Sequence, residues 1–184
     1  NLIILRKLKK LGSGADVVSM GELQLALKAG IDPQKIVFSG VGKTKEELAY
    51  AISKKILLIN TESENEINEI IKIAKNKKVT VKIGIRLNPN ITGKTNKKIS
   101  TGNKSDKFGV SLDVCFNILK QNNHNKNISI EGLSVHIGSQ IKELAPFQKT
   151  LKVVDKFLIK LKNNGINISF LDLGGGMGIP YSKS

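Results

Sequence analysis

Short runs of β-branched and apolar residues alternate along the chain with longer segments in which apolar residues recur every three or four positions. This alternation predicts βα units around a parallel sheet. The expected strands cover 15–18, 36–38, 56–59, 79–87, 130–136 and 168–173, and the expected helices cover 2–11, 20–29, 44–53, a segment from about 63, 112–121 and 146–163. Six such units fit either a (β/α)8 barrel or a doubly wound sheet.

Two local features refine this pattern. The spacing of Ser63 and Glu66 predicts a capping box at the start of the fourth helix. The segment 88–108 is rich in Gly, Thr, Asn and Lys and has no periodicity. A loop of that length inside a compact domain is usually functional or disordered.

Composition narrows the class of protein. The 184 residues, 40% of them hydrophobic, suit one domain or most of a larger one. The single Cys115 excludes an internal disulfide, and no apolar stretch approaches the roughly 18 residues of a membrane span, so we expect a cytoplasmic protein that does not enter a membrane. The net charge of +15 comes from lysines spread along every helix, and aromatic residues make up only 4%, which disfavours nucleic-acid binding.

Glycine-rich segments raise the question of nucleotide binding. The segment from Ser39 to Thr44 resembles the end of a P-loop, but Val37 stands where its first glycine is required, so a βα turn with Thr44 capping the helix is expected. Gly12–Gly14 and Gly174–Gly178 also fail the dinucleotide pattern. The later run follows an apolar strand, which suits either a phosphate cradle or a tight turn.

Polar side chains at strand ends are the remaining candidates for chemistry. His136 ends a strand and is followed by Gly138 and Ser139, which favours a site over an ordinary core or surface histidine. Arg86 is one of two arginines, which indicates either a specific anionic ligand or a buried ion pair. Asp16 lies among apolar neighbours and needs a partner. The sequence contains neither metal-ligand spacing nor a defensible catalytic triad.

Seven motifs occur together in one order. They are Gly12–Ser19, Phe38–Lys43, Arg86–Pro89, Ile99–Gly102, Lys107–Gly109, His136–Ser139 and Leu171–Gly176. On these motifs the chain resembles the diaminopimelate decarboxylase family, one of the pyridoxal-phosphate-dependent decarboxylases with an alanine-racemase-type barrel. The resemblance implies an α/β fold, a partial (β/α)8 TIM barrel with about six of the eight strands present.

The resemblance also implies pyridoxal 5'-phosphate as cofactor. The positions that match the family's cofactor-binding residues are Asp16, Arg86, His136, Ser139, Gly174, Gly175 and Gly176. Of these, His136 would stack on one face of the pyridine ring, while Ser139 and the three glycines would help bind the phosphate. The family's Schiff-base lysine lies in a strand motif before Asn1, so no catalytic residue is assigned within the chain.

For the intact enzyme the resemblance implies decarboxylation of meso-2,6-diaminopimelate to L-lysine, in a homodimer with a shared active site. Residues 1–184 would be the pyridoxal-phosphate-binding barrel domain, incomplete at both ends and without the family's C-terminal β-domain, and inactive alone. The alternatives are a related decarboxylase acting on ornithine or arginine, and a non-catalytic, decarboxylase-like regulatory protein. The loop from Ile99 to Gly109 favours the diaminopimelate branch.

Overall fold

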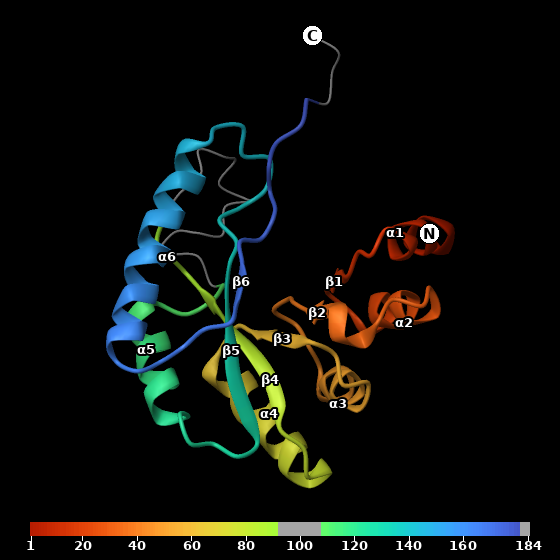
Figure 1. Ribbon diagram of the computed structural model, residues 1–184, viewed down its shortest axis with the longest axis horizontal. Helices are drawn as coiled ribbons and strands as arrows, with labels where there is room; N and C mark the ends of the chain where they lie inside the picture. The colour runs from red at the N-terminus through yellow and green to blue at the C-terminus, as the bar shows by residue number, and fades with distance from the viewer. Residues whose placement is uncertain (92–107, 181–184) are drawn as a thin grey trace. The chain divides into compact units, whose positions relative to one another are not determined.

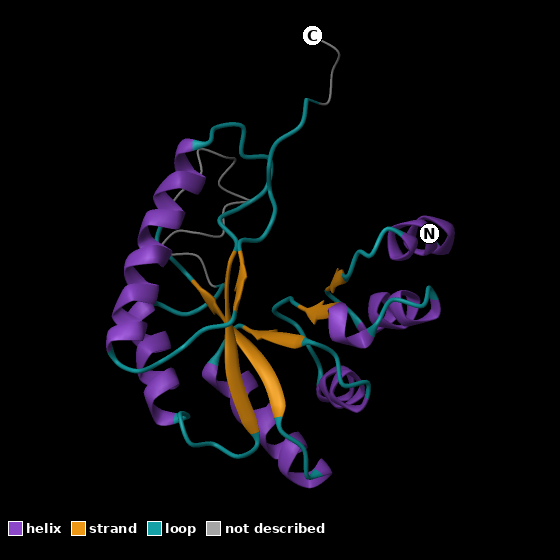
Figure 2. Ribbon diagram, viewed as in Figure 1, coloured by secondary structure: helices purple, strands orange, loops and turns teal. Residues whose placement is uncertain are grey.

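The computed structural model describes residues 1–91 and 108–180, along which helices and strands alternate (Figure 2). The helices are α1 (Leu2–Lys10), α2 (Met20–Lys28), α3 (Lys45–Ser53), α4 (Glu64–Lys77), α5 (Leu112–Gln121) and α6 (Ala145–Asn163), with a 3-10 turn, η1, at Pro33–Lys35. The strands are β1 (Ala15–Val17), β2 (Ile36–Phe38), β3 (Leu58–Thr61), β4 (Val81–Leu87), β5 (Ile128–Val135) and β6 (Phe170–Asp172). This is the order of elements that the hydropathy pattern predicts.

The strands of the described residues lie in one sheet in their sequence order, β1-β2-β3-β4-β5-β6. β1 pairs in parallel with β2, β2 with β3, and β5 with β6. Gly14, just before β1, lies against Lys35, the residue that directly precedes β2. A Cβ on Gly14 would be 2.1 Å from the carbonyl oxygen of Lys35. A glycine in the motif before β1 is therefore required by packing of the backbone.

The chain forms two compact units, and β4 and β5 run through both. Unit 1 comprises residues 1–84 and 122–130, and unit 2 comprises the described parts of 85–121 and 131–184. In unit 1, consecutive helices from α1 to α4 are neighbours (Figure 1). In unit 2, α5 and α6 lie side by side, joined by an ion pair of 3.5 Å between Asp113 and Lys160. Each unit buries its own apolar side chains, among them Phe38 and Ile70 in unit 1 and Leu133 and Phe157 in unit 2.

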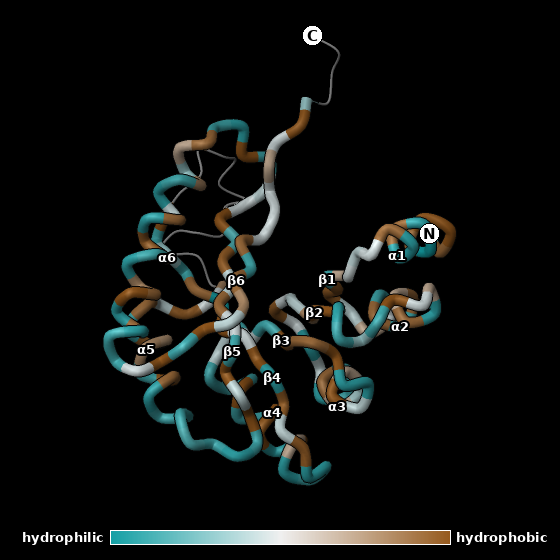
Figure 3. Tube along the Cα trace, viewed as in Figure 1, coloured by the Kyte–Doolittle hydropathy of each residue, from teal (hydrophilic) through white to brown (hydrophobic). Residues whose placement is uncertain are grey.

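The lysine-rich helices are amphipathic, as α6 illustrates. Its buried residues are Pro146, Thr150, Val154, Phe157 and Leu161. These positions recur every three or four residues, so they form one stripe along the helix. Apolar and polar positions consequently alternate along α6 in Figure 3, and the lysines belong to its solvent-facing side.

The start of α3 confirms the predicted βα turn. Thr44 Oγ1 accepts the backbone N–H of Glu47, and the Glu47 carboxylate accepts the backbone N–H of Thr44, which makes a complete capping box. Glu47 also accepts the N–H of Met20 at the start of α2. These hydrogen bonds to the ionised carboxylate, the one from Thr44 first, lower the pKa of Glu47 below its ordinary value of 4.5.

The predicted capping box at the start of α4 is realised differently. Ser63 Oγ accepts the N–H of Glu66, as predicted. The Glu66 carboxylate accepts one hydrogen bond from the backbone N–H of Glu62 and another from the ammonium group of Lys43. The spacing of Ser63 and Glu66 predicts a cap made by these two residues alone. In the structure, the ion pair with Lys43 also holds the Glu66 side chain.

Most strands differ from their predicted bounds by one or two residues at an end, and two of these differences concern the candidate residues. β3 covers Leu58–Thr61 in place of 56–59, and it pairs with β2 through Leu58 and Ile59. Thr61 at its polar end is buried, and its hydroxyl donates to the carbonyl oxygen of Gly84 at 2.8 Å. β5 ends at Val135, so His136 follows the strand directly.

Apolar side chains remain exposed at the two ends of the strand order. On β6, Leu171 is 42% exposed, and Leu173 just beyond it is 44% exposed. Helix α1, which precedes β1, has no buried residue, and Leu11 at its end is 81% exposed.

Within residues 1–91 and 108–180, no helix combines the length and the apolar character that crossing a bilayer requires.

Candidate cofactor-binding site

The segments that follow β5 and β6 run side by side. The N–H of Ile141 donates to the carbonyl oxygen of Gly176 at 2.8 Å, and the N–H of Gly178 donates to the carbonyl oxygen of Ile141 at 2.9 Å. Ile141 and Met177 thereby form a parallel bridge. The parallel pairing of β5 and β6 is thus resumed beyond the ends of both strands, at the edge where barrel enzymes carry their active sites.

Two glycines of the 174–178 run are needed for this close approach. A Cβ on Gly174 would lie 2.6 Å from the carbonyl oxygen of Val135, and one on Gly176 would lie 1.8 Å from the carbonyl oxygen of Gly138. Both glycines also have positive φ, 66° and 91°. Only glycine meets both conditions at these positions.

The glycines alternate in what they face. A Cβ on Gly178 would meet Gln140 and Lys142 at 3.0–3.2 Å, which places it on the same side as Gly174 and Gly176. Gly175, between them, has no atom within 4 Å of its Cβ position. The even-numbered glycines therefore serve the contact between segments, and the Cβ position of Gly175 faces open space.

His136 is fixed by the same segment. It is half-buried, and the N–H of Gly175 points at its Nδ1 at 3.5 Å. The Asp172 carboxylate accepts the N–H of Gly174 at 2.8 Å and so holds the turn that begins the glycine run. Ser139, three residues after His136, is exposed. Five of the predicted residues, His136, Ser139 and the three glycines, are therefore brought together within unit 2.

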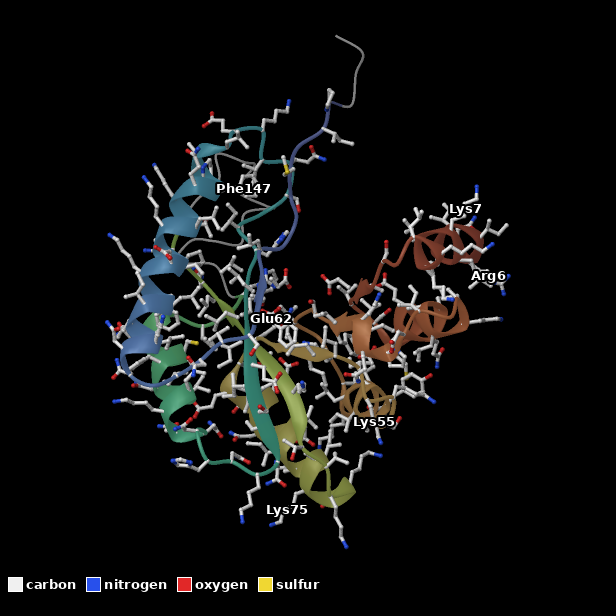
Figure 4. The ribbon with its side chains drawn as sticks, viewed as in Figure 1. Arg6, Lys7, Lys55, Glu62, Lys75 and Phe147 are labelled. Atoms are coloured by element: carbon white, nitrogen blue, oxygen red, sulfur yellow. The ribbon has the colours of Figure 1, made fainter. Side chains whose placement is uncertain are left out.

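Arg86 lies on β4, in the part of that strand that belongs to unit 2. It is half-buried, and its guanidinium carbon lies 5.5 Å from the centre of the Phe108 ring, a cation–π contact. The other arginine, Arg6, is exposed on α1 and extends away from it (Figure 4). The motif Ile99–Gly102 and Lys107 of the following loop lie outside the described residues.

Asp16 belongs to unit 1, where it is part of a chain of hydrogen bonds. The Ser39 hydroxyl donates to Asp16 Oδ1 at 2.7 Å, and the Asn60 amide donates to Ser39 Oγ at 3.1 Å. These residues come from the C-terminal ends of β1, β2 and β3. Asp16 is exposed on its strand. It is therefore not buried among its apolar sequence neighbours, in contrast to the expectation from the sequence.

Ser39, Asn60 and Glu62 are polar residues at strand ends that are not predicted from the sequence. Asn60 is buried within β3, and Glu62, 9% exposed, follows the strand immediately (Figure 4). The signal that could identify them is their position at the end of a buried apolar run, where a polar residue needs a partner. Applying that criterion to every strand in turn would have selected all three.

The unit 2 residues suit a phosphate ester that carries a flat ring. The hydroxyl of exposed Ser139 is a donor of the kind that binds phosphate, and a half-buried imidazole whose Nδ1 faces the N–H of Gly175 offers a face for stacking. The space left by the absent Cβ of Gly175 gives such a group access to the backbone. No group of His, Cys, Asp or Glu side chains in the described ranges could hold a metal ion.

This chain is similar to diaminopimelate decarboxylases of two bacteria. It is 42% identical over 184 residues to a diaminopimelate decarboxylase of Campylobacter jejuni, covering 100% of this chain and 46% of that protein. It is 44% identical over 185 residues to one of Helicobacter pylori, covering 100% of this chain and 45% of that protein. The chain therefore spans less than half the length of these relatives.

Solved structures of diaminopimelate decarboxylases are also similar to this chain. A diaminopimelate decarboxylase from Helicobacter pylori, complexed with L-lysine, superimposes with a TM-score of 0.96 at 42% identity over 100% of this chain and 47% of that one. One from Methanocaldococcus jannaschii, also complexed with L-lysine, gives a TM-score of 0.90 at 42% identity over 100% of this chain and 43% of that one. The predicted α/β fold, part of a (β/α)8 barrel, is confirmed.

The family model described as the pyridoxal-binding domain of pyridoxal-dependent decarboxylases matches residues 1–184. The predicted pyridoxal cofactor is confirmed at the level of this family. The chain belongs to the family of pyridoxal-binding domains of pyridoxal-dependent decarboxylases.

Proposed function

We propose that residues 1–184 form the cofactor-binding part of a diaminopimelate decarboxylase, which converts meso-2,6-diaminopimelate to L-lysine. The observation that carries the proposal is the pair of bridged segments after β5 and β6, where Gly174–Gly176 lie beside His136. It occurs in a chain about 42% identical over its whole length to proteins of that name.

The bound group's phosphate would contact the backbone at Gly174, Gly175 and Gly176 together with the hydroxyl of Ser139. Because the even-numbered glycines are locked against the neighbouring segment, their peptide groups hold fixed directions before the phosphate arrives. His136 would lie against one face of the pyridine ring, with its orientation set by the contact at Nδ1.

Arg86 and Asp16 complete the proposed set. Contact with Phe108 steadies the Arg86 guanidinium, a permanent cation that suits an anionic group. Ser39 fixes one oxygen of the Asp16 carboxylate. Each of the two side chains is thus oriented by a neighbour inside its own unit.

When bound, pyridoxal phosphate supplies the electron sink for the pair released as the α-carboxylate leaves as carbon dioxide. The reaction breaks one carbon–carbon bond and adds one proton at the same carbon. The residues described here act by binding and orienting. Holding the phosphate and the ring at separate points fixes the plane against which the breaking bond must be aligned.

The proposal includes a domain assignment. Residues 1–184 would be a barrel domain that is incomplete at both ends, and a C-terminal β-domain would belong to the same enzyme. Exposed Leu171 and Leu173 on the β6 side, and a first helix without buried residues, support further elements at both ends of the strand order. Residues 1–184 alone would then be inactive.

Assays of the full-length enzyme test the activity. With pyridoxal phosphate present, carbon dioxide release is measured with meso-diaminopimelate, ornithine and arginine in parallel. Release from diaminopimelate with L-lysine as product is expected. Activity on ornithine or arginine alone would assign the enzyme to the related branch, and cofactor binding without release from any of the three would favour a regulatory protein.

Assembly and location extend the proposal. A homodimer with a shared active site is expected to give twice the subunit mass in light scattering of the full-length enzyme. Two inactive variants altered in different domains would restore activity when mixed if the site is shared. Location in the cytoplasm, predicted from the single Cys115, is tested by fractionation of the cells that produce the protein.

A further inference from the structure

Lys43 is a buried cation whose donors are all used. Its Nζ lies 2.7 Å from Glu66 Oε1, 2.6 Å from the carbonyl oxygen of Gly40 and 2.7 Å from that of Asn60. The side chain is 1% exposed, and that of Glu66 is 12% exposed. An ammonium group has three protons, so these three acceptors satisfy it completely. Such a lysine is unsuited to bind a phosphate or to act as a nucleophile.

The three acceptors tie together separate elements of unit 1. Gly40 follows β2, Asn60 lies in β3, and Glu66 lies in the first turn of α4. Lys45, two residues further on, makes a superficially similar pair with Glu69 of α4 at 3.4 Å, but its side chain is 71% exposed. An exposed pair of that kind contributes little. The buried lysine is therefore distinguished by the backbone atoms that it holds.

The held atoms belong to the polar chain at the strand ends. Asn60 accepts from Lys43 through its carbonyl oxygen and donates through its amide to Ser39 Oγ. Gly40, the other backbone partner, follows Ser39 directly, and Ser39 donates to Asp16. We propose that Lys43 is a positioning residue, which sets the Ser39–Asn60 pair and through it the orientation of the Asp16 carboxylate. The inference rests on the proposed function only in assigning Asp16 to the cofactor site.

Charge burial supports a positioning role over one in stability. Removing an ammonium and a carboxylate from water costs free energy that a well-packed apolar pair of similar volume would not cost. An apolar pair, however, could not direct the carbonyl groups of Gly40 and Asn60. The ion pair adds directed hydrogen bonds, which packing alone does not provide.

The test separates these roles in the full-length enzyme. Lys43→Met leaves the Glu66 carboxylate buried without its cation, so thermal stability and affinity for pyridoxal phosphate should both fall. Lys43→Met combined with Glu66→Gln removes both charges and keeps an oxygen for the N–H of Glu62. We expect this double variant to regain most of the stability, while its affinity for the cofactor, measured by visible absorbance titration, stays roughly ten-fold weaker.

The matched control is Lys45→Met combined with Glu69→Gln, which should change neither quantity. Ser39→Ala interrupts the chain at a second point and should weaken cofactor binding similarly. Added to the Lys43 and Glu66 pair, it should produce little further loss, because both changes break one network.

Recovery of both stability and cofactor affinity in the double variant, or full additivity with Ser39→Ala, would overturn the positioning role. Failure of the unaltered full-length enzyme to bind pyridoxal phosphate would instead refute the proposed function.

Discussion

Replacing Gly176 by alanine tests the packing of the two site segments. The new Cβ would lie 1.8 Å from the carbonyl oxygen of Gly138, whereas ordinary contact begins at 3.4 Å, so the segments must separate by 1.6 Å. Separation breaks the hydrogen bonds that join Ile141 to Gly176 and Gly178, at 2.8 and 2.9 Å. Each contributes about 0.5–1.5 kcal/mol.

A side chain at the φ of 91° found at Gly176 adds about 1–2 kcal/mol. The expected loss in the free energy of unfolding is therefore about 2–5 kcal/mol, a large part of the 5–15 kcal/mol typical of a domain. Gly175→Ala is the matched control, because no atom lies within 4 Å of its Cβ position. Its stability should stay within about 0.5 kcal/mol of the unaltered protein.

The two variants should separate stability from binding. Urea denaturation of the apo form of the full-length enzyme measures stability, and titration with pyridoxal phosphate measures affinity. Gly176→Ala should lose both, whereas Gly175→Ala should keep its stability and bind the cofactor more weakly, because the methyl group occupies the open side. Equal destabilisation by the two substitutions would refute the alternation of the glycines.

Three further predictions concern single side chains. Ser139→Ala should lower the affinity for pyridoxal phosphate without changing the denaturation midpoint, because Ser139 is exposed; an unchanged affinity would remove it from the site. Burial raises the pKa of the Cys115 thiol to about 12, so mass spectrometry should find it unmodified by iodoacetamide at pH 8 until the protein is unfolded. The pKa of Glu47 is lowered below 4.5 in the folded state, so its contribution to stability is complete above that pH and is lost as pH falls further. In thermal melts, Glu47→Gln should therefore lower the stability more at pH 7 than at pH 3.

The order of the elements could be predicted from hydropathy, because each helix and strand buries a periodic face. The bounds of β3 could not be. An apolar run from Ile56 to Ile59 predicts the strand there, but the strand continues to polar Thr61, whose hydroxyl bonds to the carbonyl oxygen of Gly84. Long-range pairing decides such a boundary, and a single sequence does not reveal it.

The site was predictable only in part, for the same reason. His136, Ser139 and the glycines could be predicted, because they directly follow apolar strands. Which of the glycines pack against the neighbouring segment could not be predicted, because that segment lies about forty residues away in sequence. Gly174 packs against His136 and Gly176 against Gly138. Lys43 resembled a P-loop lysine in local sequence, and its buried partners give it another role.

The bridge between Ile141 and Met177 has a consequence for the thermodynamics of cofactor binding. Loops that become ordered around a ligand lose conformational entropy, and that loss reduces affinity. Here the backbone of the glycine run is already immobilised by the adjoining segment, so most of that entropy is lost during folding. Glycine, the residue with the most conformational freedom in an unfolded chain, is thus held in one conformation here, and the amide hydrogens of Ile141 and Gly178 that join the segments should exchange slowly even before the phosphate binds.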